Sequence, residues 1–159
     1  ILSKPVYREE FTGRKPKIFP LKYPNALADL LLKQLNKLEE YNLNRIRAAK
    51  YYFKNLKVNK HLVLPSNKAG SIYLRFNILI NNAGVKLKAA RKKHMLLGNW
   101  YHEVIDPEGV EKDKIGYRTG SCPRAEYFAL QSLNLPTYPG LNDENLFIII
   151  IFIYNHVAY

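Results

Sequence analysis

Apolar residues recur at spacings of three and four along the first third of the chain, which is the pattern of an amphipathic helix. They are Leu27, Leu30, Leu31, Leu35, Leu38, Tyr41, Leu43, Ile46, Ala49 and Phe53. Pro24 suits the first turn of such a helix, and charged side chains cover much of its other face. We predict one long helix over residues 23–55, preceded by an extended, proline-containing lead-in over residues 1–22.

Two β-like runs follow, over residues 61–64 and 71–80, with Pro65 and Gly70 in the connection between them. In the second run, every other residue is apolar, as in a strand with one buried face. These positions are Ile72, Leu74, Phe76, Ile78 and Ile80. Arg75 lies between them, so it is predicted to point away from the core.

A second helix is predicted over residues 85–94, with Val85, Leu87 and Ala90 facing inward. Its remaining positions are rich in basic residues, namely Lys86, Lys88, Arg91, Lys92 and Lys93. Such a face is able to attract phosphates, but no aromatic side chains are interleaved with it as in single-strand binders. A solvated basic face is the alternative.

The last third of the chain starts with glycine-rich loops over residues 96–120, and a short helix is predicted to begin near Cys122. Asn142, with Asp143 and Glu144 behind it, has the form of a helix N-cap. The residues after it are mostly β-branched or aromatic and favour strand. We favour a final helix because caps are positional evidence, and strand is the alternative.

These elements predict an α+β fold with one small sheet, and residues 56–159 form its domain. The net charge of +12 indicates attraction to phosphates, nucleic acid or an anionic membrane surface, or simply a solvated basic surface. The single cysteine, Cys122, excludes an internal disulfide, and charged residues interrupt any apolar stretch near the start. The longest apolar run, residues 146–154, is too short to cross a bilayer. We therefore expect a cytoplasmic protein without a membrane partner.

Several blocks of sequence, in order, resemble one family. The first runs from Tyr23 to Tyr52 and contains Gln-Leu-Asn-Lys-Leu at residues 34–38. The others are Gly-Asn-Trp-Tyr at 98–101, Gly-Ser-Cys-Pro-Arg-Ala-Glu at 120–126 and Asn-Leu-Pro-Thr at 134–137. Their types and order are similar to those of DegT/StrS sugar aminotransferases, which depend on pyridoxal phosphate (PLP). The resemblance covers most of the chain.

The resemblance implies the carboxy-terminal small domain of a fold-type I PLP-dependent transferase, together with the long helix that leads into it. The family transfers an amino group, usually from glutamate, to a keto-sugar nucleotide. Its Schiff-base lysine lies in a large domain whose sequence blocks do not occur among these 159 residues. No lysine here is carried over as catalytic, and the chain is expected to be catalytically incomplete alone.

The resemblance also implies individual roles. Pro20 and Lys22 fall where the family has an asparagine and a basic residue near the PLP phosphate of the partner subunit, so Lys22 is the cofactor-binding candidate. The substrate-side candidates are Asn25, Arg75, Tyr101 and Tyr117. Each also has a simpler explanation, as a helix-start or surface-strand residue without a binding role. Val104 and Asp106 replace a proline and a histidine of the family's sugar site, and Asp106 repels a diphosphate.

Two functions remain open at this point. The first is a part of a PLP-dependent sugar aminotransferase that needs a PLP-binding large domain or partner subunit, and that self-associates through its apolar helix and its uncharged end. The second is a basic binding module for nucleic acid or an acidic protein. We expect the first. The four histidines are scattered, so no metal site is expected.

Overall fold

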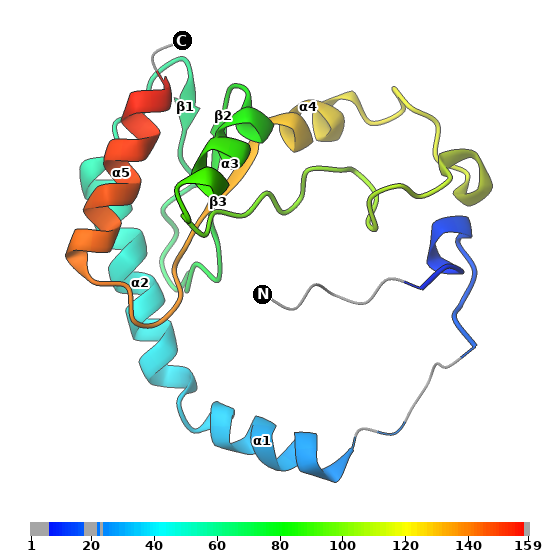
Figure 1. The fold of residues 1–159 in the computed structure, drawn as a ribbon, viewed down its shortest axis with the longest axis horizontal. Coiled ribbons are helices and arrows are strands. Elements are labelled where there is room, and N and C mark those ends of the chain that lie inside the picture. The colour runs from blue at the N-terminus through cyan, green and yellow to red at the C-terminus, as the bar shows by residue number, and fades with distance from the viewer. Residues whose placement is uncertain (1–6, 18–21, 23, 158–159) are drawn as a thin grey trace.

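The computed structural model describes residues 7–17, 22 and 24–157. Figure 1 shows a small three-stranded sheet packed against helices, with one further helix extending away from the sheet. The predicted α+β fold is confirmed.

The predicted long helix is two helices. α1 spans Asn25–Leu35 and α2 spans Leu38–Asn55. The break falls at Asn36 and Lys37, where the Lys37 amide donates to the carbonyl oxygen of Gln34 instead of continuing the helical ladder. In α2 the buried side chains are Ala48, Ala49 and Tyr52, whereas α1 buries none of its side chains and extends from the end of α2 (Figure 1).

The sheet has the order β1–β2–β3, and both pairings are antiparallel. β1 spans Leu62–Val63, β2 spans Phe76–Ile80 and β3 spans Ser132–Leu135. β3 was not predicted, although polar and apolar residues alternate along it. Phe76 lies opposite Leu135 and Ile78 opposite Leu133.

Strand β2 is shorter than the predicted run over residues 71–80. Tyr73 has a φ of 49°, which is incompatible with a continuous strand. The Thr137 hydroxyl lies within donating distance of the carbonyl oxygens of Tyr73 and Leu74, at 2.9 and 3.1 Å, and holds this bend. Ile72 and Leu74 were predicted to be buried, and this is wrong, because both are exposed.

The sheet has one apolar face and one polar face. Phe76, Ile78, Ile80, Leu133 and Leu135 are buried in the core together with residues of α2 and of two further helices. These are α3, which spans Ala83–Lys92, and α5, which spans Asp143–Val157. Side chains alternate along a strand, so the intervening residues of β2 and β3 present their side chains on the opposite face.

The basic helix α3 starts two residues earlier than predicted, and its inward face differs. Ala83, Lys86, Leu87 and Ala90 are buried, whereas Val85 is exposed, so the prediction for Val85 is wrong. Lys86 is not part of a solvated or phosphate-binding face. Its Nζ donates to the carbonyl oxygen of Asn81 at 2.5 Å, and burial lowers the pKa of its amine.

The final segment is helical, as predicted. The Asn142 Oδ1 accepts a hydrogen bond from the Asn145 amide at 2.8 Å, which confirms the cap. Leu146, Ile149, Ile150 and Ile153 form the buried stripe of α5 at helical spacing. The other apolar side chains of α5 include three exposed ones, Phe147, Ile148 and Ile151.

Two short 3₁₀ turns join distant parts of the chain. η1 spans Glu10–Thr12, inside the predicted extended lead-in, and η2 spans Lys112–Ile115 in the glycine-rich loops. The Glu111 amide donates to the Phe11 carbonyl oxygen at 2.8 Å.

The predicted short helix is α4, which spans Pro123–Gln131. Among the described residues, no helix has both the length and the apolar character needed to cross a membrane.

Candidate functional site

Asn134 of β3 joins three segments on the polar face of the sheet. Its Nδ2 donates to Asn77 Oδ1 at 2.9 Å, and its Oδ1 accepts from the Trp100 amide at 2.6 Å. The hydroxyl of Ser132 also donates to Asn77 Oδ1 at 2.9 Å. Asn134 is buried, so these bonds form in a poorly hydrated environment where an unpaired partner is costly. The network fixes the backbone at Trp100 against the sheet.

Gly98 pairs with Asn134 through two backbone hydrogen bonds, of 3.0 and 2.7 Å. A Cβ at position 98 would lie 3.2 Å from the Asn134 Oδ1, which is a tight contact with a buried, hydrogen-bonded atom. The close approach to the Asn-Leu-Pro-Thr block therefore favours a glycine in the Gly-Asn-Trp-Tyr block, because a side chain here would displace the Asn134 amide. Two sequence blocks that are separate in the chain form one structural unit here.

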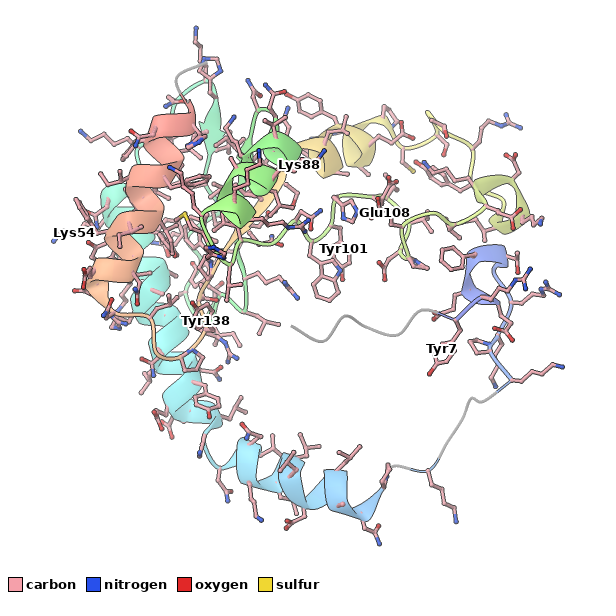
Figure 2. All side chains as sticks on the ribbon, viewed as in Figure 1. Tyr7, Lys54, Lys88, Tyr101, Glu108 and Tyr138 are labelled. Atoms are coloured by element: carbon pink, nitrogen blue, oxygen red, sulfur yellow. The ribbon has the colours of Figure 1, made fainter. Side chains whose placement is uncertain are left out.

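This unit presents an arginine and two aromatic rings. The Arg75 guanidinium carbon lies 4.0 Å from the centre of the Trp100 ring, a cation–π geometry. The rings of Trp100 and Tyr101 are 4.6 Å apart and tilted by 32°. All three side chains are exposed, which confirms that Arg75 points away from the core. Figure 2 shows Tyr101 on the loop that runs from the sheet toward Glu108.

A cavity of about 440 Å³, which we call the aromatic cavity, lies between these rings, the polar face of the sheet and α4. Its lining combines aromatic rings with hydrogen-bonding groups and two carboxylates. The residues are Asn77, Leu79, Trp100, Tyr101, Glu103, Val104, Asp106, Ala125, Phe128, Ala129 and Ser132. It contains no lysine or arginine, so its charged groups are acidic.

Tyr117 lies in a smaller cavity of about 200 Å³ that shares Glu103, Val104 and Ala129 with the aromatic cavity. Its hydroxyl donates to Glu126 Oε1 at 2.6 Å, and the same oxygen accepts from the Gly120 amide at 2.7 Å. The hydrogen bond to Glu126 raises the pKa of Tyr117 to about 12, and in turn it lowers the pKa of Glu126. Tyr117 is thus a neutral donor at physiological pH, and its proton is directed at Glu126.

The structure brings three of the five sequence-predicted residues near one another. Arg75 and Tyr101 flank Trp100, and Tyr117 lies in the adjoining cavity. Asn25 is the exposed first residue of α1, and Lys22 is exposed just before this helix; neither lines the cavities described above. Pro20 lies outside the described residues.

The sequence analysis missed the side chains that organise the site, namely Asn77, Trp100, Ser132 and Asn134. The period-2 alternation of Ser132-Leu-Asn-Leu135 was the available indication of a strand with a polar face. Which polar residues of the two strands pair depends on the register, and the register is a property of the folded sheet.

The described residues do not fit PLP by themselves. Lys86 is their only buried lysine, but its Nζ donates to a backbone carbonyl and it lines neither of these cavities. The aromatic cavity offers no cation to a phosphate and no amine to an aldehyde. Within the same residues, no group of three histidine, cysteine or acidic side chains is arranged to hold a metal ion.

The fold is shared with solved aminotransferases. DesV from S. venezuelae, solved with a ketimine intermediate, matches with a TM-score of 0.69 and 22% identity, over 82% of this chain and 35% of that one. PseC from Helicobacter pylori, an aminotransferase involved in the biosynthesis of pseudoaminic acid, matches with a TM-score of 0.67 and 22% identity, over 79% and 35%. A DegT/DnrJ/EryC1/StrS aminotransferase from Brucella abortus matches with a TM-score of 0.65 and 23% identity, over 81% and 34%.

The chain thus spans about a third of the length of these solved proteins. No curated protein sequence matches it. The sequence profile of the DegT/DnrJ/EryC1/StrS aminotransferase family, however, matches residues 7–152, which is nearly all of the chain. The chain therefore belongs to the DegT/DnrJ/EryC1/StrS aminotransferase family.

Proposed function

We propose that this chain supplies the carboxy-terminal, small-domain part of a PLP-dependent aminotransferase that acts on a keto-sugar nucleotide. The observation that carries the proposal is the family match over residues 7–152, in a fold that aligns with about a third of each solved relative. The chain is catalytically incomplete alone, because its described residues do not form a PLP site. A PLP-binding large domain or partner subunit supplies the Schiff-base lysine.

In this proposal the aromatic cavity receives the sugar part of the substrate. Trp100 and Tyr101 offer flat apolar surfaces, and Glu103 accepts hydrogen bonds from hydroxyl groups. Asp106 disfavours a diphosphate in the same space, since like charges repel, whereas the charge of Glu103 is partly offset by Lys112, whose Nζ lies 3.7 Å from Glu103 Oε2. The diphosphate is therefore expected outside this cavity.

The remaining predicted residues have supporting roles. Tyr117 and Arg75 lie at the edges of the proposed sugar-binding region. Asn25, the first residue of α1, contacts the substrate. Lys22 contacts the PLP phosphate of a partner subunit through its positive charge. The proposal also includes self-association of this chain.

A cytoplasmic location is part of the proposal. The exposed free thiol of Cys122 supports a reducing compartment.

Reconstitution tests the proposal. The DNA upstream of the Ile1 codon is sequenced, and the PLP-lysine segment found in frame or in an adjacent gene is produced separately. We expect the two parts together, with PLP, glutamate and a keto-sugar nucleotide, to release 2-oxoglutarate, and each part alone to release none. Equal activity of the large part without this chain would refute the proposal.

Lysine mapping tests the cofactor statement on this chain. After incubation with PLP and reduction with borohydride, we expect low, scattered labelling of exposed lysines such as Lys54 and Lys88 by mass spectrometry. The physical reason is that Lys86, the only buried lysine among the described residues, already donates to a backbone carbonyl, whereas Lys17 and Lys114, which line a cavity beside Arg8 and Arg14, are exposed to water. Stoichiometric labelling of one lysine would contradict this.

A basic binding module is the second candidate function. One observation favours it, which is that α3 exposes Lys88, Arg91 and Lys92 on one short helix (Figure 2 labels Lys88). Fluorescence anisotropy with a labelled oligonucleotide at physiological salt decides between the two. Saturable, salt-sensitive binding that is lost in Lys88→Gln and Lys92→Gln would favour the module.

A further inference from the structure

A second cavity lies on the other side of the Arg75–Trp100 stack, because Trp100 lines the aromatic cavity whereas Arg75 lines this one. Its volume is about 450 Å³. Arg45 of α2, Arg75 before β2 and Tyr138 after β3 contribute to it, so it joins three parts of the fold. Figure 2 shows Tyr138 where the chain leaves β3 beside α2. We call it the arginine cavity.

The arginine cavity carries charge of one sign. Its lining contains two arginines and no aspartate or glutamate. Within the described residues, neither Arg45 nor Arg75 forms an ion pair. Arg47, two residues after Arg45 in α2, differs, because its Nη1 lies 2.6 Å from the carboxylate of Asp143. The two cavity arginines therefore have no anionic partner in the described chain.

Both guanidinium groups are oriented by uncharged contacts. The Arg75 guanidinium carbon lies 4.0 Å from the centre of the Trp100 ring, a contact that restrains the guanidinium without using its N–H groups as hydrogen-bond donors. Arg45 donates from Nη1 to Asn42 Oδ1 at 2.7 Å. An oriented guanidinium loses less entropy when it binds a carboxylate or phosphate than a freely moving one does.

Apart from Asn134 and Thr137, which are polar and buried, most of the remaining lining is apolar, and part of it is exposed. Leu74, Leu96 and Tyr138 are each about half exposed or more, so the cavity offers them to a ligand. Pockets for small organic molecules have volumes of about 300–1,000 Å³ and combine such apolar walls with a few polar groups. An inorganic anion would use the arginines but would leave the apolar wall in water.

We propose that the arginine cavity binds a small organic anion, whose carboxylate or phosphate is held by Arg45 and Arg75 and whose apolar body lies on Leu74, Leu96 and Tyr138. Arg75 lies between this cavity and the proposed sugar-binding region, but binding to the arginine cavity requires neither PLP nor a sugar nucleotide, so the test below is separate from the test of the proposed aminotransferase function.

Calorimetric titration of the full chain with four probes tests the proposal. Benzoate and phenyl phosphate carry an anionic group on an apolar ring, benzamide is the neutral analogue of benzoate, and inorganic phosphate lacks the ring. We expect the two aromatic anions to bind at least about tenfold more tightly than benzamide and inorganic phosphate, because charge-assisted hydrogen bonds and ring burial then act together. The tighter of the two aromatic anions identifies the preferred anionic group.

Variants locate the site. Arg45→Gln and Arg75→Gln are each expected to weaken binding about tenfold or more, whereas the matched control Arg91→Gln, on the exposed face of α3, leaves it unchanged. Circular dichroism shows that each variant is folded. Trp100, the only tryptophan in the chain, lies under Arg75, so its fluorescence should change on binding to the unaltered chain. Equal affinity in Arg75→Gln and the unaltered chain, or equal affinity for benzoate and benzamide, would overturn the proposal.

Discussion

Substitution of Asn134 by alanine tests whether the polar network on the sheet stabilises the fold. The change removes the hydrogen bonds from Asn134 Nδ2 to Asn77 and from the Trp100 amide to Asn134 Oδ1. Each net hydrogen bond contributes about 1 kcal/mol, and a buried partner left without one costs about 1–3 kcal/mol more. We expect the free energy of unfolding to fall by about 2–4 kcal/mol, which is a large fraction of the stability of a small domain.

Urea unfolding followed by circular dichroism measures this loss, and Trp100 fluorescence reports the local environment of the same network. Asn99→Ala is the matched control, since the Asn99 side chain makes no hydrogen bond within the described structure and lies one residue from Trp100. Asn134→Asp separates the two bonds. It keeps an oxygen that accepts from the Trp100 amide but places a charge and an acceptor against Asn77 Oδ1, so its loss should be at least as large.

A loss below about 0.5 kcal/mol in Asn134→Ala, within the range of ordinary surface substitutions, would refute this reasoning. So would equal losses in Asn134→Ala and Asn99→Ala. The first result would mean that water replaces the side-chain bonds without cost, and the second would mean that the loss does not come from the Asn134 hydrogen bonds.

Three further predictions concern the surface and the loops. Arg75→Ala should lower the free energy of unfolding by less than about 1 kcal/mol in urea titration, because the exposed cation–π contact with Trp100 is the only interaction that the Arg75 guanidinium makes with the described residues. A loss above about 2 kcal/mol would indicate a buried, paired arginine. In Glu126→Gln, the pKa of Tyr117 should fall from about 12 toward its ordinary value, measured by NMR titration of the ring carbons, and an unchanged pKa would contradict the role of Glu126. Sedimentation velocity should show self-association that increases with salt, as the repulsion from the +12 charge is screened, and Leu30→Glu with Leu31→Glu should reduce it because both leucines are exposed on α1. A monomer at low and high salt would contradict that expectation.

The sequence by itself determined the kinds of element and most of their places. The kind and place of a helix or strand depend on apolar periodicity, capping residues and turn residues, all of which act within a few residues of the chain. The Asn142 cap outweighed the strand propensity of the isoleucine run after it, because the side chain satisfies an amide that the first turn of α5 would otherwise leave unpaired. Apolar periodicity located α2, as part of one longer predicted helix, and the core of β2, and the end of the glycine-rich loops near Cys122 located α4. The ordered sequence blocks were also sufficient to indicate the family, which the profile match confirms.

Only the tertiary structure decided which residues meet. The Thr137 hydroxyl, more than sixty residues away, holds the bend at Tyr73 that ends the predicted alternation and exposes Leu74. Lys86 is buried because a backbone carbonyl lies within reach of its amine, and no periodic pattern predicts such a partner. The candidate site arises in the same way, because the register of β2 against β3 brings Asn134 beside Asn77. Contacts between distant segments depend on register and packing, which local sequence patterns do not specify.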